Sequence, residues 1–181
     1  MGGVDKAMLQ LAGKSLIGHC IARLEPQVER LAISANGDLA RFSRLGLPVL
    51  PDAEECGPLA GILAALKWAG ALGATAVVSV AVDTPFFPGD LTPSLCLAAE
   101  SAAEGLAMAH SENDHPTCGL WPVRLAPALR KFLASGAKAR VLDFANTHHA
   151  QRAVFPDATA FHNVNTPDDL AQAEAMLRGA A

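Results

Sequence analysis

The chain has 181 residues, of which 51% are hydrophobic and 18% are charged, and its formal net charge at pH 7 is −4. This size predicts one globular domain, because single cores extend to roughly 250 residues. The acidic balance, with scattered Lys and Arg, argues against partners such as nucleic acid or anionic membranes, and no apolar run reaches the ~20 residues of a membrane span. Four cysteines without CxxC spacing indicate reduced thiols. With no signal-peptide pattern, we expect a cytoplasmic protein that binds small molecules.

Short Val-, Ile- and Leu-rich runs alternate with alanine-rich helical segments. This alternation is typical of βαβ units and predicts a single α/β domain over 1–181, with a mostly parallel sheet between two helical layers. The expected strands are 7–11, 28–35, 48–50, 76–82, 106–110, 116–121 and 152–155. The expected helices are 16–24, 39–45, 58–70, 92–104, 125–134, 139–146 and a terminal helix from 167. We expect Ser15, Asp38 and Thr166 to be the N-caps of the helices that begin at 16, 39 and 167.

Two of these strands, 106–110 and 116–121, are separated by only five polar residues. This spacing predicts a β-hairpin that interrupts the βα alternation and adds antiparallel strands at a sheet edge.

The segment AVVSVAV at 76–82 is a near-continuous apolar strand that ends on Asp83. A strand of this kind is typically buried on both faces, so an ionised carboxylate at its end is costly unless a cation or several donors meet it. Thr84-Pro85 begins no helix that Asp83 could cap. We therefore expect a positive group beside Asp83, and a metal ion is the favoured interpretation.

Other polar residues follow strands at the carboxyl edge of the sheet, where open parallel α/β sheets bind ligands. These are Ser34 with Asn36, and Asp52; Asp52 is equally well explained as a turn or cap residue. Lys6 near the N-terminus and Asn163-Val164-Asn165 near the C-terminus complete the candidates.

Five short motifs occur in an order that resembles the molybdenum cofactor guanylyltransferase family, a group of nucleotidyltransferases with a Rossmann-like fold. The motifs are MGGVDK at 1–6, GPLAG at 57–61, DTP at 83–85, DHPT at 114–117 and NVNTPDDL at 163–170. Each is weak alone, but together they span nearly the whole chain.

The resemblance implies transfer of GMP from GTP to molybdopterin, with Mg²⁺ as the cofactor and pyrophosphate as the leaving group. The attacking phosphate is mostly a dianion at neutral pH, since its second pKa is about 6, so no general base is required. Neutralising negative charge and aligning the attack are the remaining tasks. Client molybdoenzymes or their chaperones are possible further partners of such a family member.

By the same resemblance, Asp83 is the Mg²⁺ ligand and a catalytic residue, and Lys6 is the catalytic lysine that contacts the nucleotide. Asn165 is the candidate second metal ligand, with a turn residue as the equal alternative. Asp52 corresponds to an aspartate that binds the base or the ribose.

Further positions are implied for the nucleotide and the pterin. Ser34 stands where the family commonly has Asn, so that Asn36 is expected to take part of the contact. The segment Gly57, Pro58 and Leu59 is expected beside the base. Asp114 and His115 in the hairpin are candidates for the pterin side.

The family also carries a first strand and a Gly-rich loop of the type LAGGxxxR upstream of the motif that here starts at Met1. The 181 residues contain neither. If they were the whole polypeptide, we would expect unpaired neighbouring strands, poor stability and little activity; an internal Met taken as the start, or a shortened chain, is the simpler explanation.

Three alternatives to the guanylyltransferase interpretation stay open. The chain could act as a cytidylyltransferase on the same pterin, or as a sugar-phosphate nucleotidyltransferase. It could also be a non-catalytic module that binds a nucleotide or the cofactor.

Overall fold

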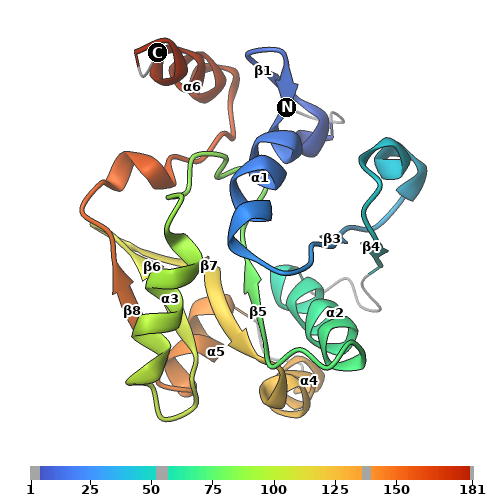
Figure 1. Cartoon of the computed structure of the whole chain (residues 1–181), viewed down its shortest axis with the longest axis vertical. Helices are drawn as coiled ribbons and strands as arrows, with labels where there is room; N and C mark the ends of the chain where they lie inside the picture. The colour runs from blue at the N-terminus through green and yellow to red at the C-terminus, as the bar shows by residue number, and fades with distance from the viewer. Residues whose placement is uncertain (1–4, 52–56, 136–139, 180–181) are drawn as a thin grey trace.

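A computed structural model describes residues 5–51, 57–135 and 140–179 of the chain (Figure 1). The strands are β1 (Gln10–Leu11), β2 (Lys14–Ser15), β3 (Ile33–Ser34), β4 (Val49–Leu50), β5 (Ala76–Ser79), β6 (Ala107–His110), β7 (Asp114–Pro122) and β8 (Gln151–Val154). The α-helices are α1 (Leu16–Leu24), α2 (Pro58–Ala71), α3 (Leu91–Glu100), α4 (Ala126–Ala134), α5 (Val141–Thr147) and α6 (Pro167–Gly179). Short 3₁₀ helices are η1 (Lys6–Met8), η2 (Glu25–Gln27), η3 (Leu39–Leu45), η4 (Val123–Leu125) and η5 (Ala158–Phe161).

The largest sheet has the strand order β5-β7-β6-β8. β7 pairs antiparallel with both β5 and β6, whereas β8 pairs parallel with β6. β5, β6 and β8 therefore run in one direction and β7 runs against them. The expected α/β class, the mostly parallel strands and the β6–β7 hairpin are confirmed. The expected edge position of the hairpin is wrong, because β7 is inserted between β5 and β6.

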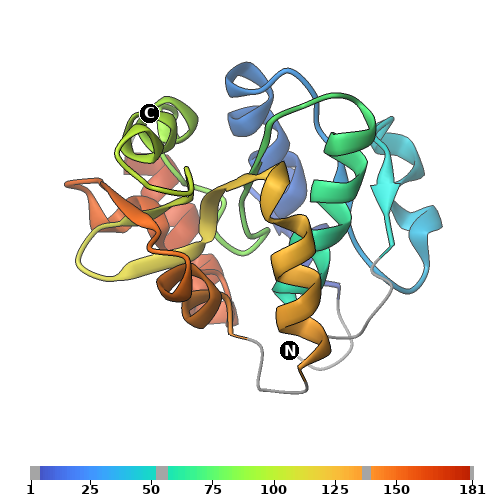
Figure 2. The same cartoon turned by 90° about the horizontal axis from the view of Figure 1, so that it is seen from below.

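Helices cover both faces of this sheet. Successive strand residues point to opposite faces, and on β6 Ala107 and Ala109 pack in one apolar cluster with residues of α1 and α3. Met108, between them, packs in a second cluster with residues of α2, α4 and α5. Figure 2 shows α3 and α5 on opposite sides of the strands. The arrangement is the expected three-layer α/β/α sandwich.

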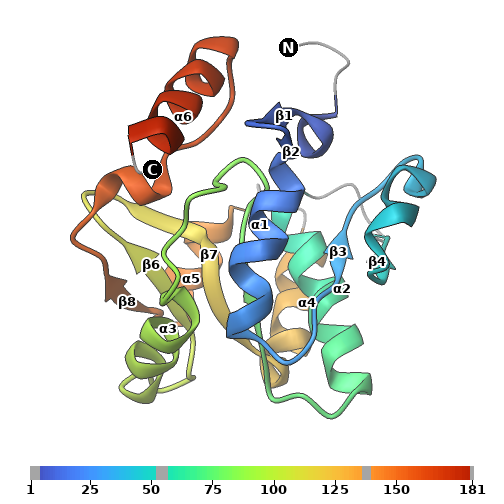
Figure 3. The same ribbon diagram turned by 45° about the horizontal axis from the view of Figure 1, so that its top comes forward.

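A separate two-stranded sheet is formed by β3 and β4, which pair in parallel. It lies beside α1 and α2, away from β6 and β8 (Figure 3). In the part of the chain that the structure describes, no strand ladder joins β3 to β5, and a cavity of about 1350 Å³ is lined by residues of both. Within the described residues, β3 and β5 thus each have one edge without a strand partner.

This cavity explains why two strands are shorter than expected. β5 ends at Ser79 and not at Val82, and residues 76–83 are partly exposed and not buried on both faces. The reason is that β5 is paired along one edge only, while its other edge faces the cavity. The strand expected over 28–35 is likewise reduced to Ile33–Ser34.

The N-caps expected from the sequence are present. The Oγ of Ser15 accepts a hydrogen bond from the N–H of Gly18 at 3.2 Å, and the Asp38 carboxylate accepts one from Ala40 at 3.0 Å. The helix after Asp38 is 3₁₀ and ends at Gly46, whose φ of 66° suits glycine. Within the described ranges, no helix has the length and apolar character needed to cross a membrane.

Candidate functional site

The cavity between β3 and β5 is where most of the expected nucleotide-site residues meet. The residues of this set that line it are Lys6, Ser34, Asn36, Gly57, Pro58 and Asp83. Its volume of about 1350 Å³ exceeds the roughly 300–1,000 Å³ of a typical ligand pocket. Apolar side chains such as Ile17, Ile21 and Val78 line other parts of it. The part of the cavity around the ion pair of Lys6 and Asp83, here called the polar part, is suited to a phosphorylated ligand.

Three expected residues converge at this polar part, although they are far apart in sequence. The Nζ of Lys6 donates a hydrogen bond to Oδ1 of Asn165 at 2.5 Å and lies 3.7 Å from Oδ2 of Asp83. The side chains of Lys6 and Asp83 are 41% and 28% exposed, so a solute can reach the group. The expectation that a positive group stands beside Asp83 is therefore confirmed, and in this structure that group is the lysine ammonium.

Two hydrogen bonds hold the residues just before Asn165 against Asp83 and Thr84. The N–H of Val164 donates to the carbonyl oxygen of Asp83 at 2.7 Å, and Oγ1 of Thr84 donates to Oδ1 of Asn163 at 2.8 Å. These bonds run from the chain after β5 to the chain before α6, which brings the Asn165 amide within reach of the carboxylate.

The start of α6 holds the same segment from its other end. The Asp169 carboxylate accepts hydrogen bonds from the N–H groups of Asn165 at 2.9 Å and Thr166 at 2.8 Å. In return Oγ1 of Thr166 accepts from the N–H of Asp169 at 3.1 Å, which is a reciprocal capping box. These donors, the N–H of Asn165 first, hold the pKa of Asp169 below its usual 3.8. Sequence reasoning saw Thr166 as the cap but missed the role of Asp169, which the T-x-x-D spacing could have shown.

Ser34 and Asn36 lie at the end of β3, where the parallel neighbour β4 delivers Leu50 and Pro51. Ser34 is paired with Leu50 in the ladder, and the N–H of Ala35 donates to the carbonyl of Leu50 at 3.1 Å. Asp52, expected to contact the base or ribose, lies outside the described residues.

The expected base-contacting segment at the start of α2 divides between the cavity and the core. Gly57 precedes the helix with φ of 72°, a left-handed conformation that favours glycine, and Pro58 occupies the first turn. Leu59, in contrast, is fully buried and packs with Leu106 and Trp121. The Leu59 side chain therefore packs in the core, and the expected place of this segment beside the base concerns its backbone.

Asp114 and His115, the pterin-side candidates, lie in an internal polar network on the hairpin and not in the cavity lining. Asp114 accepts from Nε and a terminal nitrogen of Arg152, at 3.3 and 3.0 Å, and its Oδ1 lies 2.8 Å from Nδ1 of His110. The hydrogen bond from Arg152 is the main cause that lowers the pKa of Asp114. His115 stacks on Phe161 at 4.2 Å between ring centroids, and burial lowers its pKa.

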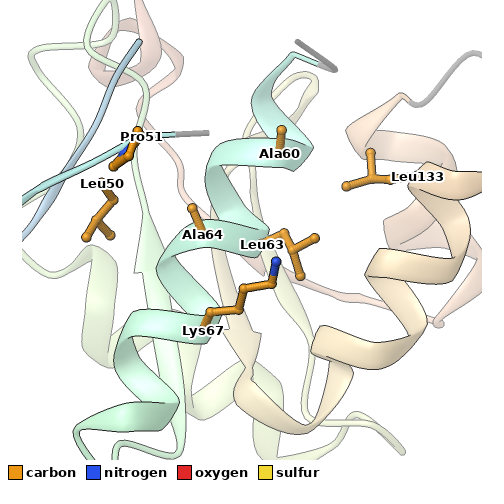
Figure 4. A pocket seen from close by; sticks show the side chains of 7 residues that line it. All are labelled: Leu50, Pro51, Ala60, Leu63, Ala64, Lys67 and Leu133. Carbon is orange, nitrogen blue, oxygen red and sulfur yellow. The ribbon is translucent and has the colours of Figure 1, made fainter. Parts of the chain in front are cut away.

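A second, smaller cavity of about 290 Å³ lies on the other side of α2, between that helix, the end of β4 and α4 (Figure 4). Its lining is apolar except for Lys67, and it contains none of the expected site residues that the structure describes. It is too small and too apolar to compete with the larger cavity as a nucleotide site.

Among the described cysteines, the two buried ones are not suited to nucleophilic chemistry. Cys20 and Cys118 are buried thiols, and desolvation raises the pKa of each to about 12. A thiol with so high a pKa carries almost no thiolate at neutral pH and is a poor nucleophile.

Comparison with known proteins agrees with this geometry. Residues 1–153 match the family model described as the MobA-like NTP transferase domain. The chain is 57% identical, over 98% of its length and 91% of the relative's, to a protein of Cereibacter sphaeroides named molybdenum cofactor guanylyltransferase. A protein of Mesorhizobium japonicum with the same name is 46% identical over 98% of this chain and 90% of its own.

Solved structures show the same fold. The molybdopterin-guanine dinucleotide biosynthesis protein A of Archaeoglobus fulgidus superposes with a TM-score of 0.76 over 98% of this chain and 92% of that chain, at 22% identity. A 2-C-methyl-D-erythritol 4-phosphate cytidylyltransferase of Thermus thermophilus superposes with a TM-score of 0.74 over 96% and 94%, at 20% identity. The family match and the close relatives together show that this chain belongs to the MobA-like NTP transferases, among relatives named molybdenum cofactor guanylyltransferase.

Proposed function

We propose that this chain transfers GMP from GTP to the terminal phosphate of molybdopterin and releases pyrophosphate. The observation that carries the proposal is the convergence of Asp83 and Asn165 on the Lys6 ammonium, at a large cavity that Lys6 and Asp83 line. The names of the close relatives supply the two substrates.

The reaction makes few demands on proton transfer. An oxygen of the pterin phosphate forms a bond to the α-phosphorus of GTP, and the bond from that phosphorus to the bridging oxygen of the β-phosphate breaks. The attacking phosphate is already mostly dianionic at neutral pH, since its second pKa is about 6. Positioning and charge neutralisation therefore account for the catalysis.

Lys6 supplies a positive charge for this purpose. Its ammonium is 41% exposed and lies at the cavity, so a phosphate oxygen can approach it. The amino end of α2, which begins at Pro58, faces the same cavity and adds the partial positive charge of a helix N-terminus. Both features favour the phosphates of the nucleotide.

The residues present fit a magnesium ion. The Asp83 carboxylate and the Asn165 amide oxygen already converge on one cation, the Lys6 ammonium, and oxygen donors of this kind are the ligands that Mg²⁺ takes. No group of three His, Cys, Asp or Glu side chains suited to a metal is found among the residues that the structure describes. Asp83 and Asn165 would hold the ion together with substrate phosphates and water, and the bound ion would neutralise charge on the triphosphate.

Ser34, Asn36 and Gly57 line the cavity from β3 and α2, on the sides that a base or ribose could occupy. We assign the nucleoside contact to these residues and to Asp52. A carboxylate at Asp52 would accept from the N1–H and N2–H groups of guanine, which cytosine does not offer in that pattern.

The test is an assay with molybdopterin, Mg²⁺ and either GTP or CTP, in which pyrophosphate and the dinucleotide product are both measured. We expect product with GTP and its loss when EDTA removes the metal. A preference for CTP would overturn the guanine assignment. Binding of GTP and Mg²⁺ without any product would mean that the chain is a binding module and not an enzyme.

A further inference from the structure

Arg41 on η3 reaches two segments that face each other at the polar part of the cavity. Its guanidinium forms an ion pair with the Asp5 carboxylate, and it donates hydrogen bonds to the carbonyl oxygen of Asn36, at 3.0 Å, and to that of Asp38. It also lies 4.3 Å from the centre of the Phe42 ring. Arg41 thus links the loop after β3, through its hydrogen bonds, to Asp5 before η1, through its ion pair.

Asp5 connects this contact to the catalytic lysine. Its Oδ1 accepts a hydrogen bond from the N–H of Ala7 at 3.1 Å and so caps η1, the turn whose first residue is Lys6. The same carboxylate therefore shapes the turn and anchors it to Arg41. From that turn the Lys6 ammonium extends to Asp83 and Asn165.

Apolar packing also joins the two segments, but it does not orient them. Ala7, Ile33 and Phe42 belong to one buried cluster, which brings η1 next to β3 and η3. Hydrophobic contact is non-directional, whereas a guanidinium is planar, permanently charged and donates in fixed directions. Arg41 adds two directional hydrogen bonds to the loop after β3 and a charge attraction to Asp5, which favour one placement of the Lys6 turn relative to Asn36.

We propose that Arg41 is a positioning residue of the GMP transfer, which acts through Asp5 to hold the Lys6 turn in place against the nucleotide-binding end of β3. The inference rests on the proposed function. A displacement of about 1 Å at a reacting group can cost roughly 100-fold in rate, so a partial loss of this anchor is measurable in turnover.

The test is a double-mutant cycle on kcat/KM for GMP transfer with Arg41→Gln, Asp5→Asn and the combined variant. Asn at position 5 keeps an oxygen that can cap Ala7 but loses the charge. We expect each single variant to lose about tenfold and the combined variant to lose no more than either, because both break one contact. Arg41→Lys, which keeps the charge without the planar fork, should lose less than Arg41→Gln.

Arg44→Gln is the matched control, since Arg44 is an exposed residue of the same 3₁₀ helix and does not line the cavity. We expect it to leave kcat/KM unchanged. A full additional loss from Arg41→Gln in the Asp5→Asn background would show that Arg41 does not act through Asp5, and would overturn the inference. Wild-type activity of Arg41→Gln would overturn it as well.

A second readout separates this inference from the proposed function. The rate at which acetic anhydride modifies Lys6, measured by mass spectrometry against Lys131 on α4, needs no catalysis. Arg41→Gln should raise that rate, because a looser turn leaves the Lys6 ammonium less often beside Asp83 and Asn165. If the wild type makes no dinucleotide, the proposed function fails while this measurement still stands; an unchanged Lys6 rate would overturn the role of Arg41.

Discussion

Replacing Asp83 by Asn separates the proposed catalytic role of this carboxylate from its role in stability. The substitution keeps the size of the side chain and removes its charge. At the 3.7 Å between Lys6 Nζ and Asp83 Oδ2, two charges attract by about 1 kcal/mol in water. Both side chains are partly exposed, and pairs of this kind contribute roughly 0.2–1 kcal/mol to folding. Lys6 also keeps its hydrogen bond to Asn165.

We therefore expect Asp83→Asn to shift Tm by no more than about 2–4 °C, while kcat for GMP transfer falls by roughly 100- to 1,000-fold, as for other groups that stabilise developing charge. The assays are thermal unfolding followed by circular dichroism and a pyrophosphate-release assay at saturating GTP. Asp90→Asn is the matched control, because Asp90 is exposed before α3 and makes no side-chain cap. A kcat within about threefold of the wild type would refute the reasoning, since it would show that the carboxylate does not act in the transition state.

Three further predictions concern the surrounding structure. Because Arg152 lowers the pKa of Asp114 from 3.8, the stabilisation lost in Asp114→Asn should be full at pH 7 and should shrink progressively as the pH falls from about 4 towards the lowered pKa, measured by urea unfolding; a difference that does not shrink below about pH 4 would contradict this. Ser79→Ala should destabilise by about 1–3 kcal/mol, since Oγ of Ser79 accepts at 2.8 Å from the indole N–H of buried Trp121; an unchanged urea midpoint would refute it. Iodoacetamide should modify exposed Cys96 long before buried Cys118, and mass spectrometry showing equal rates would contradict the burial.

Local features were predictable because their causes are local. A hydroxyl or carboxylate just before a helix caps it whatever lies beyond, so Ser15 and Asp38 were correctly placed as N-caps. The short polar link at 111–113 likewise joins β6 and β7 in a hairpin. The position of β7 between β5 and β6 was not predictable, because strand order depends on how the whole sheet packs.

Burial was predicted less well than strand identity. The apolar run at 76–82 indicated a strand buried on both faces, and part of it does form β5. Its residues are nonetheless partly exposed, because their exposure depends on whether a neighbouring strand covers the edge of β5. Here a cavity, and not a strand, lies beside that edge. Leu59 is the opposite case, since a residue of a candidate binding motif proved to be fully buried in the core.

The sequence by itself determined the α/β class, the caps, the family and the residue types of the site, because these follow from short-range patterns and from motifs. Only the tertiary structure decided that Lys6 meets Asn165, 159 residues away in the chain, and that the same ammonium also meets Asp83. It also decided that Arg41 anchors Asp5. The physical reason is that a charge or an amide has no preferred partner until packing brings one within hydrogen-bonding distance, and packing depends on the whole chain at once.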